Sequence, residues 1–86
     1  MMENEIQVIV LVSGTIVISR IAAVVSELGE PDCKLINPYQ ILDGKLTPWL
    51  YQLTDSTDAI MISSDKILTL VDPKDDLLND YLTLIK

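Results

Sequence analysis

The sequence of 86 residues has no histidine, no phenylalanine, a single cysteine and only six lysine or arginine residues. Without histidine, the chain lacks the most frequent general base of enzymes and the commonest ligand of transition metals. The single cysteine, Cys33, excludes an internal disulfide and a cysteine-based metal site, and we expect it to be a small buried apolar residue. These absences predict that the protein is not an enzyme and holds neither a cofactor nor a metal.

Acidic side chains are the remaining candidates for chemistry. Asp55 and Asp58 enclose Ser56 and Thr57, and their oxygens are of the kind that bind calcium. This spacing matches no calcium-binding loop, so we interpret the group as a solvated turn. The sequence also has no Gly-x-Ser-x-Gly element, phosphate-binding loop or Ser-Lys pair, and we assign no catalytic residue.

The charge balance is strongly negative, with thirteen acidic residues and a formal net charge of −7. Proteins that neutralise nucleic-acid phosphates normally carry a clustered excess of lysine and arginine. Here the basic residues are scattered singly along the chain: Arg20, Lys34, Lys45, Lys66, Lys74 and Lys86. Composition therefore argues against strong, non-specific binding of nucleic acid.

The longest apolar run, residues 6–25, has a single charge at Arg20 and is long enough to cross a membrane. Its apolar residues are mostly valine and isoleucine, which favour strands, and Ser13-Gly14-Thr15 divides it into two segments of strand length. A signal peptide should begin with basic residues, whereas Glu3 and Glu5 precede this run. We therefore interpret it as a β-hairpin that turns at Ser13-Gly14, and we expect no membrane partner.

Alternation and turn residues predict five strands between residues 6 and 71. The first strand is apolar on both faces, which is typical of a strand covered on two sides. The other four are predicted at residues 16 to about 27, 33–42, 46–54 and 59–71.

Four irregularities are expected within this pattern. The long second strand bends at Ser19 or at the Ala22-Ala23 pair, where small residues are tolerated. Pro38 falls at a strand end, a bulge or an unpaired edge, because proline has no amide to donate. Asp43-Gly44 is a hairpin turn, and Ser63-Ser64-Asp65 kinks the last strand.

The spacing of apolar residues changes after residue 71 to that of a helix. Asp72 is a suitable N-cap, Pro73 suits the first helical position, and Asp75 and Asp76 complement the positive end of a helix dipole. We predict a helix from Pro73 to about Ile85 that closes a single domain of residues 1–86. Its docking stripe consists of apolar residues at helical spacing: Leu77, Leu78, Tyr81, Leu82 and Ile85.

Two stretches resemble the signatures of the Sm-like family. The hairpin "IVLVSGTIVISRIAAVV" followed by "PDCKLINP" resembles its first signature, with Leu11, Gly14 and Val17 on the fixed positions. The stretch "ISSDKIL" is similar to its second signature, Ile-Arg-Gly-acidic-x-Ile, and the resemblance spans roughly residues 6–71. The resemblance implies a mainly β fold: a small, strongly bent, five-stranded antiparallel barrel of the SH3 type, here with a C-terminal helix.

The resemblance also implies that the partner of the chain is itself. Sm-like subunits form homo-oligomeric rings when the fourth strand of one subunit pairs with the fifth strand of the next. A chain of this length buries only about 60 to 65 per cent of its unfolded surface, so an interface is a natural place for its apolar residues. The expected interface comprises residues of the fourth and fifth strands: Trp49, Leu50, Tyr51, Leu53, Ile67, Leu68, Thr69 and Leu70.

The family's RNA-contacting positions fall on residues that depart from its pattern. Its asparagine falls on Asp32, and its Arg-Gly pair falls on Ser63 and Ser64. A carboxylate repels phosphate, and serine lacks a planar cation, so we expect weak binding of single-stranded RNA at best. Lys66 either meets a phosphate or pairs with Asp65 or with a neighbour's Asp32. Many members also begin with a helix, whereas this chain ends with one.

Two functions remain open from the sequence. One is an Sm-like ring that binds RNA through a degenerate site; the other is an oligomeric structural or adaptor protein that binds none. Tyr39, Trp49 and Tyr51 form either a base-stacking platform or part of the core and interface. The short acidic chain with a C-terminal helix is similar to Sm-like proteins of marine cyanophages, which implies a place in the cytoplasm, that of the host if phage-encoded, or in the virion.

Overall fold

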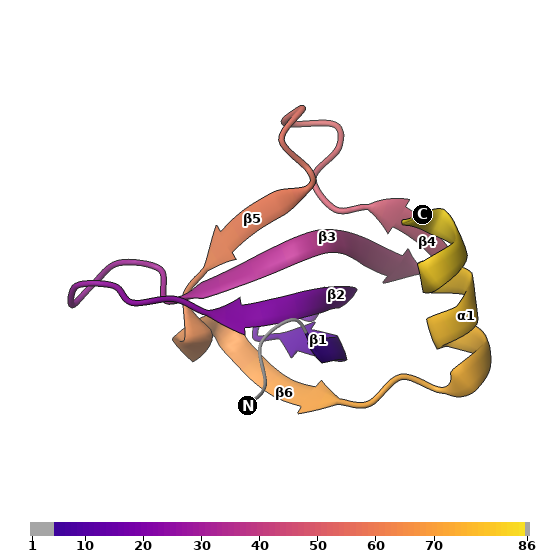
Figure 1. Ribbon diagram of the computed structural model, residues 1–86, viewed down its shortest axis with the longest axis horizontal. Helices are drawn as coiled ribbons and strands as arrows, with labels where there is room; N and C mark the ends of the chain where they lie inside the picture. The colour runs from indigo at the N-terminus through magenta and orange to yellow at the C-terminus, as the bar shows by residue number, and fades with distance from the viewer. Residues whose placement is uncertain (1–4, 86) are drawn as a thin grey trace.

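The computed structural model describes residues 5–85, and its chain forms one antiparallel sheet with a C-terminal helix (Figure 1). This arrangement confirms the mainly β prediction. The elements are β1 (Glu5–Leu11), β2 (Ile16–Ala23), β3 (Cys33–Leu42), β4 (Lys45–Pro48), β5 (Ala59–Ile62), the 3₁₀ helix η1 (Ser64–Lys66), β6 (Ile67–Val71) and α1 (Asp75–Leu84).

The long apolar run is a hairpin, as predicted. β1 pairs with β2 from Glu5 opposite Ile21 to Val10 opposite Ile16. The amide of Leu11 donates to the carbonyl of Thr15 at 2.9 Å, and Gly14 takes a φ of 93° that a residue with a side chain rarely adopts. No helix among residues 5–85 is both long and apolar enough to cross a membrane.

The antiparallel sheet does not close into a barrel, which corrects the predicted five-stranded barrel. Its strand order is β4-β3-β2-β1-β6, with β5 also paired to β3. β3 is shared because its first half, from Cys33, pairs with β5 and its second half, from Tyr39, pairs with β4. The 3₁₀ helix η1 then carries the chain from β5 to β6, and within the described residues these two strands do not pair with each other. The outer edges of β5 and β6 are therefore unpaired.

A β-bulge at Ser19 and Pro38 bends the sheet where β3 changes partners. The register between β2 and β3 shifts between Ile18 and Arg20. The hydroxyl of the buried Ser19 lies 2.7 Å from the carbonyl oxygen of Arg20 and 3.1 Å from that of Ile36. The bend is thus at Ser19 rather than at the alanine pair, and the bulge alternative for Pro38 is confirmed. β2 ends at Ala23, four residues earlier than predicted.

The predicted fourth strand, residues 46–54, is wrong beyond Pro48. The amide of Trp49 donates to the carbonyl of Pro38 at 2.9 Å, and the indole packs against the core. Leu50 has a φ of 64°, and its carbonyl accepts the amides of Leu53 and Thr54, so the chain turns instead of extending. Packing of the half-buried Trp49 against the core of its own chain accounts for the turn. The predicted fifth strand is interrupted by η1, which confirms the kink.

The helix α1 docks through the predicted stripe, in which Tyr81 is fully buried and the other four side chains are half-buried. In Figure 1 it lies beside β4 and the end of β3. The Tyr81 hydroxyl donates to the carbonyl of Asn37 at 2.8 Å, and its ring meets that of Tyr39 edge to face at 5.8 Å. The helix begins later than predicted, because Lys74 and not Asp72 is its N-cap residue. The Asp72 carboxylate instead accepts a hydrogen bond from the side-chain amide of Gln7 at 2.9 Å.

The core is formed by residues of the sheet strands together with Trp49 from the turn after β4. Its centre consists of buried residues from β1, β2 and β3, namely Ile9, Leu11, Ile21, Cys33 and Leu35. Trp49, Ile62, Ile67 and Leu70 pack against this cluster from the later part of the chain. Cys33 is a buried apolar residue as expected, and burial raises the pKa of its thiol.

Candidate functional site

Asp32 lies together with Ser63 and Ser64, although it precedes them by more than thirty residues in sequence. Asp32 directly precedes β3, and Ser63 directly follows β5. Because Cys33 is opposite Ile62 in the β3–β5 pair, Asp32 and Ser63, the residues next to them in sequence, are held side by side. Sequence reasoning named all three residues, and the strand register brings them together. We call this group, with its surroundings, the loop site.

Ser64 holds the carboxylate of Asp32 with two hydrogen bonds. Its amide donates to Oδ1 and its hydroxyl donates to Oδ2, each at 2.7 Å. The hydroxyl bond, followed by the amide bond, lowers the pKa of Asp32 below its usual range. The carboxylate is therefore negative at neutral pH, and both of its oxygens are already engaged by its own chain.

The loop site surrounds a cavity of about 280 Å³. Three carboxylate residues, Glu30, Asp32 and Asp65, line it together with Gly29 and the two serines. This lining offers mostly acceptors and negative charge, which repels phosphate and attracts cations or donors. Lys66 is exposed and is not part of the lining, although its carbonyl accepts the amide of Val12 at 2.9 Å.

A protein-family model matches residues 4–86, almost the whole chain. The chain belongs to the DUF6561 family. This family is described as one of unknown function, so the match assigns no activity to the loop site. No curated protein matches the sequence. The function of this DUF6561 chain must therefore be argued from its own geometry.

The three candidate stacking aromatics have different surroundings in this DUF6561 structure. Tyr39 packs against Tyr81, and Trp49 packs against the core. Tyr51 is 54% exposed within the turn region that follows β4. Two of the three rings are thus engaged in packing, which favours the core interpretation for Tyr39 and Trp49.

The residues expected at a subunit interface divide into two groups. Trp49, Ile67 and Leu70 contact the core of their own chain. Leu50 is half-buried in the turn that follows β4, and exposed positions are Tyr51, Leu53, Leu68 and Thr69. Of the exposed group, only Leu68 and Thr69 lie on a strand with an unpaired edge.

Sequence reasoning missed the exposed apolar residues at both strand edges, Met61 on β5 and Val71 at the end of β6. Residues 59–62, Ala-Ile-Met-Ile, are apolar throughout, so the sequence does not show that Met61 faces outward. The kink at η1 was predicted, but the separation of β5 and β6 into two edges depends on the pairing of β5 with β3 and has no local signal.

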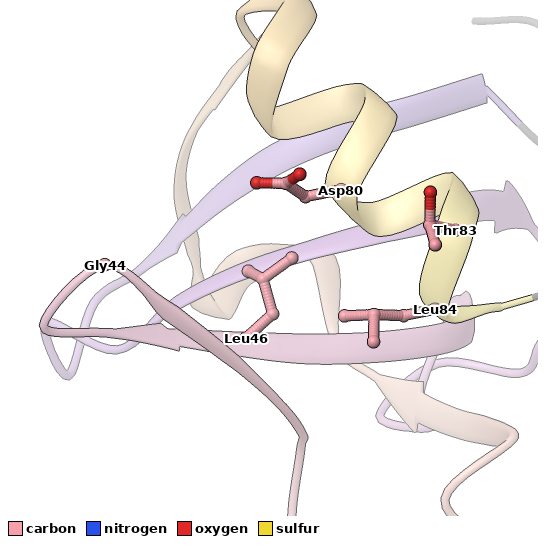
Figure 2. A pocket seen from close by; sticks show the side chains of 5 residues that line it. All are labelled: Gly44, Leu46, Asp80, Thr83 and Leu84. Carbon is pink, nitrogen blue, oxygen red and sulfur yellow. The ribbon is translucent and has the colours of Figure 1, made fainter.

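A second cavity, of about 320 Å³, lies between the β3–β4 hairpin and α1. Figure 2 shows Leu46 rising from the hairpin toward Leu84 of the helix, with Asp80 and Thr83 beside them and Gly44 at the turn. We call it the helix cavity. Sequence analysis missed it because its two walls are more than thirty residues apart. Among residues 5–85, no three His, Cys, Asp or Glu side chains are grouped to hold a metal ion.

Proposed function

We propose that this chain is a ring-forming module of the Sm-like type, in which β5 of one copy pairs with β6 of the next. The observation that carries the proposal is the pair of unpaired edges on β5 and β6 in the described part of the chain. An open edge exposes backbone donors and acceptors that another chain can pair with. Closure of several copies around an axis would pair the open edge of every β5 with that of a neighbouring β6.

Exposed apolar side chains on these strands support the same contact. Met61 on β5 is 47% exposed, and Leu68 and Val71 on β6 are 68% and 49% exposed. Burial of apolar surface stabilises an interface by about 25 cal/mol per Å². Seating these side chains on a neighbour would therefore favour association as well as satisfy the edges. The contact replaces the one expected from sequence, since the turn at residues 49–53 cannot supply a strand.

The charge of the loop site favours a structural or adaptor role for the ring, such as a place in a phage particle or its assembly. Asp32 stays ionised, Glu30 and Asp65 lie beside it, and phosphate would be repelled.

Binding of single-stranded RNA is the second candidate function. It is supported by the close approach of Asp32, Ser63 and Ser64, the positions at which the Sm-like family contacts RNA. The chain has few lysine and arginine side chains that could release the counterions of RNA. This binding is therefore weak and is lost at moderate salt.

The ring is tested by light scattering after size exclusion at micromolar concentration. We expect a mass of several subunits that persists on dilution, and we expect Leu68→Glu to reduce it to one subunit by placing a charge in the seam. Leu53→Glu is the matched control, because Leu53 is 82% exposed but lies in the turn region. A one-subunit mass for the unaltered chain would refute the ring, and dissociation by the control alone would place the contact elsewhere.

RNA binding is tested on the same sample with short U-rich and A-rich RNA at low and near-physiological salt. We expect weak binding at low salt only. Tight binding at near-physiological salt that is lost in Lys66→Ala would overturn the structural role and favour the RNA function.

A further inference from the structure

We propose that the helix cavity is a docking site for a segment of another protein that carries an apolar side chain next to a lysine or arginine. The proposal concerns a different surface from the loop site and does not depend on ring formation. It rests on the shape of the cavity, its apolar floor and the charge of the helix beside it.

The floor of the cavity is apolar and open to solvent. Leu46 of β4 and Leu84 of α1 both line it, and Leu84 is 48% exposed at the end of its helix (Figure 2). Gly44 contributes only backbone to the wall, so the entrance beside the hairpin turn is not filled by a side chain. A volume of about 320 Å³ accommodates a leucine-sized side chain, whose burial against Leu46 and Leu84 is favourable.

The negative charge at the rim favours a ligand in which a lysine or arginine is next to the apolar residue. Asp80 lines the cavity, and it follows Asp76 by four residues on the same helix. Like charges at this spacing face each other on a helix and destabilise it. α1 contains no lysine or arginine between Asp75 and Leu84 to offset them. A cation seated beside Asp80 would relieve this repulsion while the apolar side chain fills the floor.

The same charge disfavours a second copy of this chain as the occupant. Two copies joined through this cavity would bring the acidic surfaces of their α1 helices together, and each chain has a net charge of −7. A basic, apolar segment of a different protein has complementary charge and thus fits the site better.

The test uses the ¹⁵N-labelled chain of 86 residues and three short capped peptides. One peptide contains Leu-Arg, one contains Ser-Arg and one contains Leu-Glu, with otherwise identical flanking residues. We expect amide shifts at Gly44, Leu46, Asp80 and Thr83 on titration with the Leu-Arg peptide. The Ser-Arg and Leu-Glu peptides should bind at least about fivefold more weakly, because each lacks one of the two contacts.

Matched variants separate the cavity from general attraction to an acidic protein. Leu84→Ser and Asp80→Asn should each weaken binding of the Leu-Arg peptide, and circular dichroism checks that each remains folded. Leu53→Ser and Asp55→Asn make the same chemical changes at exposed positions of the β4–β5 loop and should leave binding unchanged. The proposal would be overturned if the three peptides bind equally or if the amide shifts are confined to the loop site. It would also be overturned if the cavity variants and the control variants have equal effects on binding. A fall in native mass in Leu84→Ser would also overturn it, since the cavity would then be a contact between copies.

Discussion

At the scale of single residues, two polar contacts join segments that are far apart in sequence. Tyr81 reaches from α1 to the carbonyls of Ile36 and Asn37 at the bulge of β3, at 3.2 and 2.8 Å. Ser64 holds Asp32 at the other junction, between η1 and the start of β3. Both contacts involve β3 where it begins or changes partners, so each supports the arrangement of the shared strand.

Replacing Tyr81 with Phe should lower the free energy of unfolding by about 1 to 2 kcal/mol, since the Asn37 carbonyl loses the Tyr81 donor and the Ile36 carbonyl keeps the Ser19 hydroxyl, while the ring packing is kept. For a domain of this size, the midpoint temperature should fall by roughly 4 to 8 °C per kcal/mol. Thermal and urea unfolding at one fixed protein concentration measure the change. Thr83→Val is a helix control that removes only an exposed hydroxyl bonded to Asn79. Equal effects of the two variants would contradict a special role for Tyr81.

The contact between Asp32 and Ser64 should depend on pH. Because the folded-state pKa of Asp32 is lowered, its contribution to stability is present above the unfolded pKa of about 3.9 and is lost as the pH falls through the folded value. We expect the Ser64 amide resonance to move with a midpoint below that of an ordinary aspartate. Asp32→Asn should remove this titration. A midpoint at or above the ordinary value would show that the two hydrogen bonds do not favour the charged form.

At the scale of elements, turns and the helix were more predictable than strand lengths. The β3–β4 hairpin has a two-residue turn in which Asp43 and Gly44 take φ values of 52° and 76°. Aspartate and glycine tolerate such angles, so the pair is a local signal that acts without tertiary help. The extent of β4 has no comparable signal, because it is decided by the burial of Trp49.

Gly44→Val should destabilise the fold by more than about 1 kcal/mol, since a β-branched residue is strained at positive φ. Gly44→Asn should cost less, because asparagine adopts this conformation more readily. Among residues 5–85, no atom lies within 4 Å of the position a Cβ would take, so backbone strain is the cause tested. The two variants are compared by urea unfolding. Equal losses of unfolding free energy would indicate that the φ angle at residue 44 is not the cause of the destabilisation.

At the scale of the whole molecule, net charge and open edges act in opposite directions. A charge of −7 on each copy opposes association, whereas unpaired strand edges and exposed aliphatic side chains favour it. Repulsion between exposed charges is screened beyond about 10 Å at 0.1 M salt, while apolar burial is not.

Raising sodium chloride from about 10 mM to about 100 mM should therefore strengthen self-association, because the screening length falls from about 30 Å to about 10 Å. Sedimentation velocity over a dilution series measures the dissociation constant at each salt concentration. A contact held by ion pairs would weaken over the same range, and that result would contradict an apolar seam.

The sequence by itself determined the features that depend on neighbouring residues. The glycine-containing turns at residues 14 and 44, the kink at residues 63–65 and the apolar stripe of α1 all follow from local conformational preference or periodicity, whereas the bend of the second strand was left open between Ser19 and the Ala22-Ala23 pair. The family resemblance also named the three residues of the loop site. Only the tertiary structure decided that β3 is shared by β4 and β5, that Trp49 ends β4, and that the sheet stays open between β5 and β6. Those features depend on which distant segments compete for the same strand and the same core, and no local pattern contains that information.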